Sequence, residues 1–546
     1  MAGLLRRARP RQILIIAFAC GLLFLCGQLK APANFYDEGL VLVNAERIRR
    51  GEVIYRDFWT LYSPGYFYAL AGLFSLVAPN ILIARLFDTA LRFLLTLGVY
   101  ALARPLTSWR AALLPWALVT FWLGTIRFYS YPAFPATGAI ILTALVFRRY
   151  LLNGRARWLL AAGAALGLTA LLRLDFGGYA AAGFGAALAC HEVRSAREAG
   201  VGRRGWPGRV LRAEALLAAG ALAVALPVYL PLGRAAGFAT LYEDLVHFPA
   251  TTFRAVRYLP VPPLIPDFGK INGLQWNDWL RLYLPLGTFA AGLIAAIRRL
   301  FWRPVPRADV RYQAGILLVA LVGAGLGLAV KATSRYHELH ALPMTFCAAI
   351  VATVLLHRLP RHWRQSVPFR IAAGGLAFLL LTGPYFLHFA LLAQMNAASP
   401  LGCYSTDPRA GCVPLDRNQA AVAAYIRSQT RPDEYVFIGN TRHDKIFVND
   451  LMLYFLIDRP IPTRYAELHP GLATTLPVQQ AIAAELAARD VRWVVLAAAW
   501  ESREPNASAL SSGVTYLDDY IHQHYQPVAS FGNYRVWQAK EEMRSP

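Results

Sequence analysis

The chain has 546 residues, 56% of them hydrophobic, and a mean hydropathy of +0.38. This composition excludes an ordinary soluble protein, because the apolar residues stand in many runs long enough to enter a bilayer. The formal net charge is +23, but the arginines lie in short clusters between those runs, as expected for cytoplasmic loops. We therefore predict a multi-pass membrane protein with no nucleic-acid partner.

The first 32 residues combine a basic region with an apolar run, as a signal peptide does. They show no clear small-residue cleavage site and many apolar runs follow, so we predict an uncleaved signal anchor. A transmembrane helix needs about 20 apolar residues, and about 11 segments are predicted to span the membrane. The predicted spans begin near Gln12, Ile81, Ala111, Ala133, Trp158, Phe176, Ala213, Trp279, Tyr312, Ala341 and Ile371.

The distribution of arginines predicts the topology. With the N-terminus in the cytoplasm, the clusters fall repeatedly on the cytoplasmic side, as the positive-inside rule requires. The clusters are 6–11, 104–110, 148–157, 194–212, 298–311 and 358–370. The arginine clusters fall on the cytoplasmic side only if the apolar run 66–78 does not cross the membrane. This run is shorter than a membrane span requires. We expect the outward-facing segments to line one cavity. They are the loop of Asp37, 127–135, 173–175, 234–278 and 331–340.

The first loop, residues 34–68, carries the candidate catalytic groups. Asp37 and Glu38 follow the first span by a few residues, so their carboxyls are expected at the membrane boundary, where partial desolvation raises a carboxyl pKa toward that of a useful base. The alternative role of Asp37 is a helix N-cap. Leu40, Val41, Ala45 and Ile48 then share one face of a predicted helix, and Glu46, Arg49 and Arg50 share the other. We expect this helix along the membrane surface.

The rest of the loop adds Tyr55, Arg56, Asp57, Phe58 and Trp59. These residues give an interfacial aromatic cluster, an acid and a cation able to bind phosphate. A turn at Ser63-Pro64-Gly65 leads into the run that does not span.

Three motifs carry a resemblance to a known family. They are Tyr36-Asp37-Glu38-Gly39, Tyr55-Arg56-Asp57-Phe58 and Ser63-Pro64-Gly65-Tyr66. This arrangement resembles the GT-C glycosyltransferases that use polyprenyl-phosphate sugars, of the protein O-mannosyltransferase, lipid A aminoarabinose transferase and lipopolysaccharide-core sugar transferase type. The resemblance implies a catalytic domain over 1–392 with its first extracytoplasmic loop at 31–80, and a catalytic acid at Asp37.

One departure from that family concerns a second acid. Some relatives carry an Asp in the loop between the third and fourth spans, but here residues 127–132 contain no acid. A second carboxylate must then come from elsewhere, and Glu38, Asp57 and Asp175 are available.

Two further polar groups lie between apolar segments. Arg173 and Asp175 form either part of a polar cavity or a structural ion pair. The second group forms either a phosphate site or a solvated helix end. Its members are Lys331, Arg335, His337, Glu338 and His340. Its two histidines are three residues apart and lack zinc-protease spacing, so we predict no metal site and no required cofactor. A divalent cation held with the help of Asp37 and Glu38 remains an alternative.

Residues 393–546 predict a soluble α/β domain. Strands are expected at 435–439 and 493–496 and a helix at 477–489. Cys403 and Cys412 bracket a polar loop in which a disulfide can form outside the cytoplasm. The polar stretch 465–471 either contacts acceptor or the membrane domain, or is a turn.

The predicted fold class is therefore a polytopic α-helical membrane protein of about 11 helices, GT-C-like, with a C-terminal soluble α/β domain outside a bacterial inner or plasma membrane. The predicted function is sugar transfer with inversion from a polyprenyl-phosphate carrier to an extracytoplasmic lipid, glycan or protein hydroxyl. Asp37 and Glu38 are the predicted catalytic residues. Membrane lipids are the other expected partners. The alternative is a non-catalytic transporter of lipid or solute, in which buried charges mark a substrate path.

Overall fold

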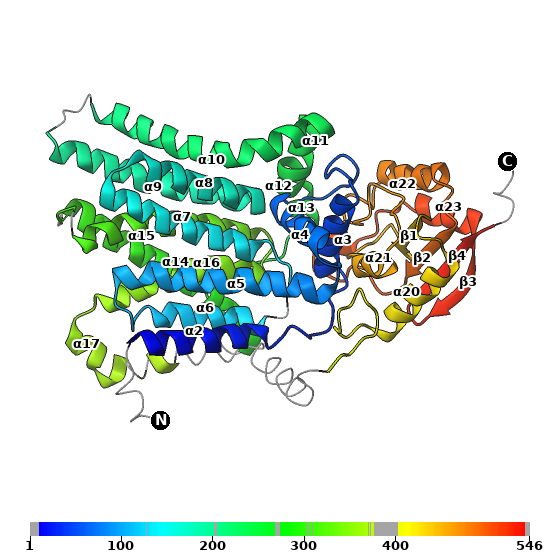
Figure 1. The fold of residues 1–546 in the computed structure, drawn as a ribbon, viewed down its shortest axis with the longest axis horizontal. Helices are drawn as coiled ribbons and strands as arrows, with labels where there is room; N and C mark the ends of the chain where they lie inside the picture. Colours follow the sequence, from blue (N-terminus) through cyan, green and yellow to red (C-terminus); the bar gives the residue numbers. More distant parts are fainter. Residues whose placement is uncertain are drawn as a thin grey trace.

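The computed structural model describes residues 10–126, 128–200, 205–267, 273–302, 305–307, 309–369, 371, 373–375 and 402–540. Long helices lie side by side over most of the molecule, and a small mixed domain covers one end of them (Figure 1). Two short helices, α3 (Asp37–Arg49) and α4 (Gly65–Leu76), lie between the two parts.

The long helices follow the apolar segments of the sequence. They are α2 (Pro10–Cys26), α5 (Ile81–Ala103), α6 (Leu113–Thr125), α7 (Ala133–Asn153), α8 (Ala156–Leu172), α9 (Leu174–Glu198), α10 (Trp206–Ala236), α14 (Gly273–Ile297), α15 (Val310–Ser334) and α16 (Glu338–His357). Shorter turns connect them: η1 (Arg104–Leu106), α11 (Phe238–Tyr242), η2 (Glu243–His247), α12 (Phe248–Ala250), α13 (Thr252–Arg257), η3 (Arg298–Trp302) and α17 (Arg361–Gln365).

Six of the described helices are long and apolar enough to cross a membrane: α5 with η1, α7, α10, α14 with η3, α15 and α16. The chain is a multi-pass membrane protein. Every predicted span from Gln12 to Ala341 coincides with a helix, but α2, α6 and α8 are shorter than a full span. The span predicted from Ile371 lies almost entirely outside the described residues, so the total of 11 stays a prediction. As expected, the run after Ser63 forms only the 12-residue helix α4.

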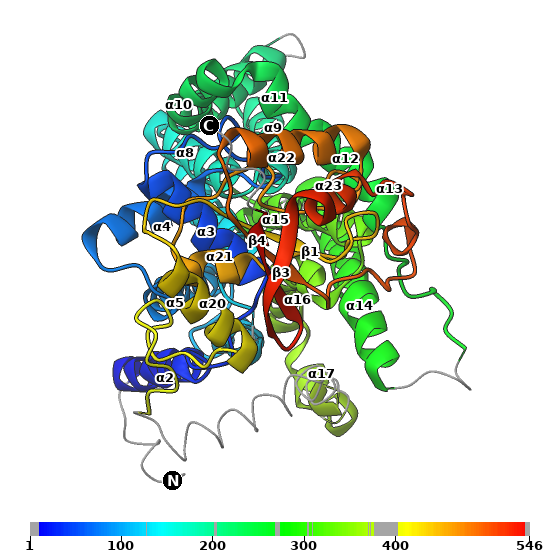
Figure 2. The same ribbon diagram turned by 90° about the vertical axis from the view of Figure 1, so that its right-hand side faces the viewer.

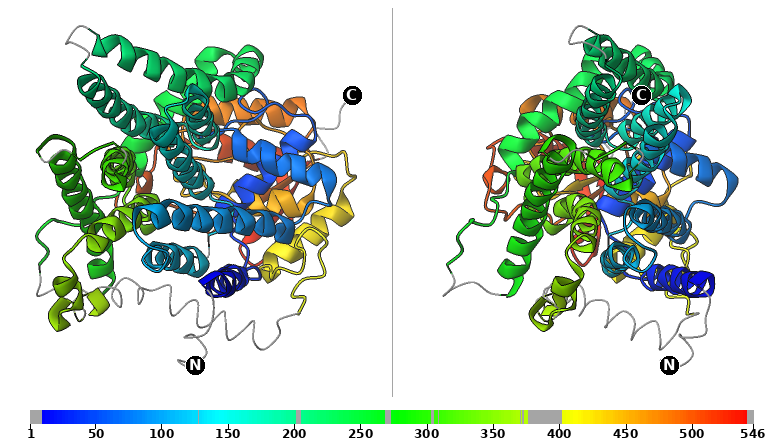
Figure 3. Two further views of the ribbon diagram at one scale, coloured as in Figure 1. Left: turned by 60° about the vertical axis from the view of Figure 1, so that its left-hand side comes forward. Right: turned by 90° about the vertical axis from the view of Figure 1, so that its left-hand side faces the viewer.

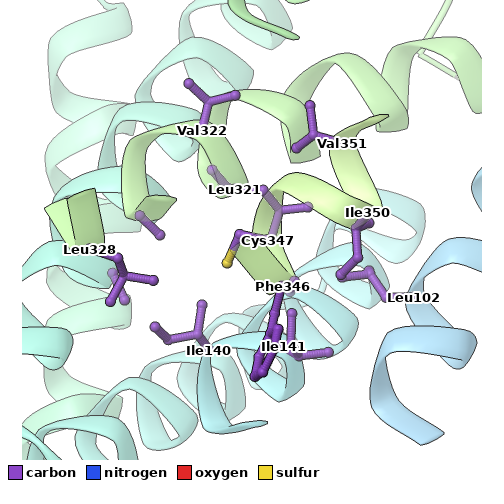
Figure 4. Close-up of a cluster of buried hydrophobic side chains, with 14 of the residues drawn as sticks. Leu102, Ile140, Ile141, Leu321, Val322, Leu328, Phe346, Cys347, Ile350 and Val351 are labelled. Atoms are coloured by element: carbon purple, nitrogen blue, oxygen red, sulfur yellow. The ribbon is translucent and has the colours of Figure 1, made fainter. Parts of the chain in front are cut away.

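The bundle core is a continuous apolar cluster drawn from α5, α7, α15 and α16, with Leu102, Ile140, Leu321, Phe346 and Ile350 almost completely buried (Figure 4). Figure 3 shows the helices with the left-hand side of Figure 1 turned toward the viewer. Small residues let helix backbones approach closely. A Cβ added to Gly323 of α15 would lie 2.6 Å from the Cα of Gly183 in α9.

The C-terminal domain, which faces the viewer in Figure 2, is built on a four-stranded sheet of order β1-β2-β4-β3 (Figure 1). Its strands are β1 (Val436–Asn440), β2 (Trp493–Ala497), β3 (Tyr525–Phe531) and β4 (Tyr534–Ala539). β1 pairs parallel to β2, with Val436 opposite Trp493, and the other pairs are antiparallel. Its helices are α20 (Arg417–Gln429), α21 (Leu451–Ile457), α22 (Leu476–Ala488), η4 (Ala507–Ala509) and α23 (Tyr516–His524).

Both predicted strands and the predicted helix of this domain are confirmed, to within a residue or two. The predicted pairing of Cys403 with Cys412 is also confirmed, because the two residues form a disulfide. The domain boundary predicted at 392/393 falls outside the described residues.

Helix α3 corrects one expectation. It does not lie along a surface, because residues on all its sides are buried between α4 and α21, including the charged residues Glu46 and Arg47. Arg47 donates to the backbone oxygens of Asp57 and Thr463. Of the charges on the predicted polar face, Glu46 is buried and pairs with Arg49 and Arg50, which stay exposed at the end of the helix.

Candidate functional site

The backbone at the start of α3 is capped by Asn34. Its Oδ1 accepts hydrogen bonds from the amides of Tyr36 and Asp37, at 2.9 and 2.8 Å. The residue in the N-cap position, Tyr36, makes no side-chain cap. The alternative role of Asp37 as an N-cap is therefore taken by Asn34, and the Asp37 carboxyl is left available for other contacts.

Asp37 faces a small cleft that it lines together with Tyr62, Ser130 and Tyr131. Asp37 as a whole residue is only partly buried, although its carboxyl is largely removed from solvent. Burial raises the pKa of Asp37 to about 6, although nearby Arg257 and Arg335 oppose the shift. A carboxyl with this pKa is mostly ionised at neutral pH and still basic enough to accept a proton.

Glu38 points away from this cleft. Both of its carboxylate oxygens accept from Arg85 of α5, at 2.7 and 2.8 Å, and both side chains are about 1% exposed. Arg85 also donates to the backbone oxygen of Leu29. Glu38 therefore joins the start of α3 to α5 and the first loop, and its oxygens are occupied by this ion pair rather than directed toward the cleft.

Two arginines from distant segments lie near Asp37. Arg257 ends α13, and Arg335 follows α15; Arg335 donates to the backbone oxygen of Arg257 at 3.0 Å. Glu504 of the C-terminal domain forms ion pairs with both guanidinium groups, a two-bond pair with Arg335 and a 3.5 Å contact with Arg257 Nε. Arg257 is 6% exposed, and its Nε makes no hydrogen bond.

Arg173 and Lys331 extend this group of cations. Arg173 pairs with Asp175 through two hydrogen bonds of 3.0 and 2.7 Å, and it lies close enough to Tyr131, which lines the cleft, to influence it electrostatically. Lys331 interacts electrostatically with Arg173, Asp175 and Arg335. The structure thus brings together Asp37, Arg173, Asp175, Lys331 and Arg335, as the expected convergence of the outer loops requires. Arg127, in one of those loops, lies outside the described residues.

The remaining predicted binding residues have other positions. Arg56 and Asp57 form an ion pair at the surface, and Asp57 also accepts from the amide of Val53. Among the described residues, no contact of this pair reaches Asp37. His337 caps α16 through Nδ1, and His340 Nδ1 bonds the backbone oxygen of Arg335 at 2.6 Å. The two histidines therefore fix the turn that presents Arg335.

No known family model matches the sequence, and no curated protein is similar to it in sequence. Solved structures do match. ArnT from Cupriavidus metallidurans bound to undecaprenyl phosphate superposes with a TM-score of 0.56 at 14% identity, over 98% of this chain and 99% of that one. The oligosaccharyltransferase AglB from Archaeoglobus fulgidus, in complex with an inhibitory peptide and a dolichol-phosphate, gives 0.52 at 14% identity, over 97% and 74%. This chain has the GT-C fold.

The GT-C bundle also contains a large apolar cavity, of about 980 Å³, between α4, α5, α7, α8 and α10. Leu171 and Leu172 line it and immediately precede Arg173 in the chain, and Pro135 lines it four residues after Tyr131. Residues that line the cavity thus stand next in sequence to residues of the polar site. The apolar cavity therefore lies near the cationic side chains.

The charged side chains that act on the carboxyl of Asp37 are mainly cationic. Among the residues that the structure describes, no three His, Cys, Asp or Glu side chains form a group that could hold a metal. Asp37 lies instead among the cations Arg257 and Arg335, with Arg173 and Lys331 close by, and such charges repel a metal ion and favour an anion.

Sequence reasoning missed three residues of this site: Arg257, Glu504 and Glu467. Glu467 accepts a hydrogen bond from the hydroxyl of Tyr36 at 2.7 Å and is 2% exposed. All three lie in segments without a recognisable motif. The one available signal was the polar stretch 465–471, for which the sequence left open contact with acceptor, contact with the membrane domain, or a turn. The hydrogen bond from Tyr36 to Glu467 shows that this stretch contacts the first loop.

Proposed function

We propose that this protein is an inverting glycosyltransferase that moves a sugar from a polyprenyl-phosphate carrier to an acceptor hydroxyl outside the cytoplasm. The observation that supports it is the placement of one carboxyl, Asp37, among four cations and beside an apolar cavity of about 980 Å³. The cations suit a phosphate, the cavity suits an isoprenoid chain, and the carboxyl suits a hydroxyl nucleophile.

The proposed step is a single displacement at the anomeric carbon. Asp37 accepts the proton of the acceptor hydroxyl while that oxygen forms a bond to the anomeric carbon. The bond from that carbon to the phosphate oxygen breaks, and its electron pair stays on the phosphate. The sugar leaves with inverted configuration, because attack and departure occur on opposite faces. The proposal needs no metal ion, in keeping with the cationic surroundings of Asp37.

The arginine pair supplies the anion-binding part of the site. Arg257 and Arg335 already hold an anionic group, the carboxylate of Glu504, so their geometry is suited to an oxyanion. We assign the carrier phosphate to Arg335 and Arg257, with Arg173 and Lys331 adding long-range attraction. A phosphate that binds both guanidinium groups would compete with Glu504 for them.

The same proposal covers the acceptor and the side of the membrane on which transfer takes place. The acceptor is a hydroxyl of a lipid, glycan or protein, and the site faces the extracytoplasmic side of a bacterial inner or plasma membrane. A non-catalytic transporter would need a path through the bundle. The cavity beside the site is apolar, which suits an isoprenoid chain better than a polar solute.

The test is direct. Purified protein is incubated with labelled polyprenyl-phosphate sugars and a lipid extract, and transfer of label to a new product is measured. We expect carrier-dependent transfer that is lost in Asp37→Asn. Protein that binds the carrier but gives no product with any sugar and any acceptor fraction would favour the transporter.

A further inference from the structure

Glu467 is a buried acid without a cation. Its Oε1 accepts from the Tyr36 hydroxyl at 2.7 Å, its Oε2 makes no hydrogen bond of good geometry although the Thr60 hydroxyl lies beside it, and the side chain is 2% exposed. Among the described residues, no Lys, Arg or His forms an ion pair with it. An isolated ionised carboxylate is costly to bury, so such a group retains its proton.

The other acids near the start of the site are already neutralised. Glu38 pairs with Arg85, Asp175 with Arg173, Asp57 with Arg56, and Glu504 with Arg335. These include all three residues that the sequence offered as a second carboxylate. Each of them is held by an arginine, whereas Glu467 bonds Tyr36, the residue before Asp37, and is influenced electrostatically by Asp37.

We propose that Glu467 is the second carboxyl of this site, held as a neutral acid by the C-terminal domain, and that it acts as a positioning residue for Asp37 through Tyr36. This inference rests on the proposed function only for its catalytic consequence. The Tyr36 hydroxyl donates to Glu467, and Tyr36 directly precedes Asp37, so the bond fixes the chain at the base. An uncharged Glu467 also leaves Asp37 free to be the anion of the pair.

The charged and titratable groups around Glu467 come from every neighbouring element. Tyr36 and Asp37 belong to the start of α3, Tyr62 to the first loop, and His469 to the same segment as Glu467. The positive charge of Arg257 acts on both Asp37 and His469. Burial, reinforced by the charge of Asp37, raises the pKa of Glu467 to about 8. Burial lowers the pKa of His469 to about 3, so it stays neutral here.

This arrangement has a consequence for stability. Glu467 binds its proton more tightly in the folded chain than in the unfolded chain, where a Glu titrates near pH 4.3. Its contribution to stability is therefore complete below about pH 4 and falls as the pH rises toward 8. Glu467→Gln keeps the shape of the side chain but cannot ionise. The variant should therefore not lose stability in this way as the pH rises.

The first experiment needs no substrate. The melting temperature of the full-length protein in detergent is measured from pH 5 to pH 8 for wild type, Glu467→Gln and the exposed control Glu501→Gln. We expect the melting temperature of Glu467→Gln to rise progressively above that of wild type as pH increases, and that of Glu501→Gln to follow wild type. Parallel curves for wild type and Glu467→Gln would show that Glu467 is ionised in the folded protein and would overturn the proposal.

The second experiment tests positioning with the transfer assay. Glu467→Gln should keep a rate within about threefold of wild type at pH 7, and it should lack the decline that ionisation of Glu467 causes in wild type above pH 8. Glu467→Ala should lose at least about tenfold, because Tyr36 loses its partner. A normal rate in Glu467→Ala, or an equal loss in both variants, would contradict the positioning role. Wild-type protein that transfers no sugar would refute the proposed function, and the melting curves would still decide the state of Glu467.

Discussion

At the residue scale, neighbouring side chains at the start of α3 have different roles in the candidate site. Asn34 caps α3, Glu38 binds Arg85, and Asp37 is left facing the cleft. Three different residues therefore have three different roles: Asn34 caps the helix, Glu38 anchors it to α5, and Asp37 is the proposed base. Substitutions within this short stretch should therefore have separable effects.

The Asp37→Asn variant should lose activity without losing structure. Asn cannot accept a proton, and general-base catalysis is typically worth about 10²–10⁴-fold. The fold should survive because Asn34 provides the cap. The measurement is the transfer rate of protein whose melting temperature matches wild type. Asp57→Asn is the matched comparison in the same loop and should cost far less. Near-normal turnover in folded Asp37→Asn would falsify its role as base.

The pH dependence of transfer should report the same carboxyl. The pKa of Asp37 is raised to about 6 by burial, and only the ionised form accepts a proton. The value of kcat/KM should therefore fall about tenfold per pH unit below pH 6 and level off above it. The profile is measured from pH 5 to 7.5. A profile that is flat over this range would mean that another group accepts the proton.

The phosphate assignment predicts a selective effect on the donor. Arg257→Ala and Arg335→Ala should each raise the donor KM about 10- to 100-fold, since a charged hydrogen bond contributes about 1.5–3 kcal/mol. Arg254→Ala, an exposed neighbour on α13, is the control. The measurement is the donor KM of each variant at saturating acceptor concentration. If both site variants match Arg254→Ala, the phosphate is bound elsewhere, and Arg173 and Lys331 become the residues to test.

At the scale of elements, α3 joins the membrane helices to the C-terminal domain. Phe35 stacks on Trp500 with ring centroids 3.9 Å apart, and its backbone oxygen accepts from the amide of Met452 at 2.8 Å. Gly39 packs so closely against the backbone of Leu451 and Met452 that a side chain at this position would have no space. The first loop and the C-terminal domain therefore form one packed unit, which explains how Glu467 and Glu504 reach the site.

The close packing at Gly39 predicts a strong effect of one methyl group. A Cβ at this position would lie 2.3 Å from the amide nitrogen of Met452, a backbone atom that cannot rotate away. Gly39→Ala should destabilise the docked domain by about 1–3 kcal/mol and increase proteolytic release of the C-terminal domain. Gly72→Ala on α4, where a Cβ meets nothing within 4 Å, is the control. Equal protease resistance of the two variants would show that the interface can yield.

At the scale of the whole molecule, the two ends of the helix bundle differ in charge and in covering. The C-terminal ends of α7, α9, α14 and α16 lie at the end of the bundle opposite the C-terminal domain (Figure 1), and arginines stand in or directly after each of them. The proposed site lies at the covered end. By the positive-inside rule, we predict that the basic end faces the cytoplasm and that the C-terminal domain lies outside.

This orientation is tested by the disulfide. After mild reduction of intact cells, a membrane-impermeant thiol reagent should label Cys403, because the domain faces outward in the predicted topology. Cys347, buried in the bundle, should stay unlabelled and serves as the internal control. Labelling of Cys403 that requires broken cells would reverse the topology and place the site in the cytoplasm.

The sequence by itself determined the membrane class, the strands at Val436 and Trp493 and the candidate base at Asp37. These depend on composition, on local periodicity and on a short motif, which are properties of neighbouring residues. Only the tertiary structure decided which acids are free. Glu38 looks equivalent to Asp37 in the sequence, but packing places Arg85 against it. Glu504 carries no local signal, and Glu467 carries only the weak one of the polar stretch 465–471. The environment of both is made by distant segments of the chain, and burial and charge pairing exist only once those segments are packed together.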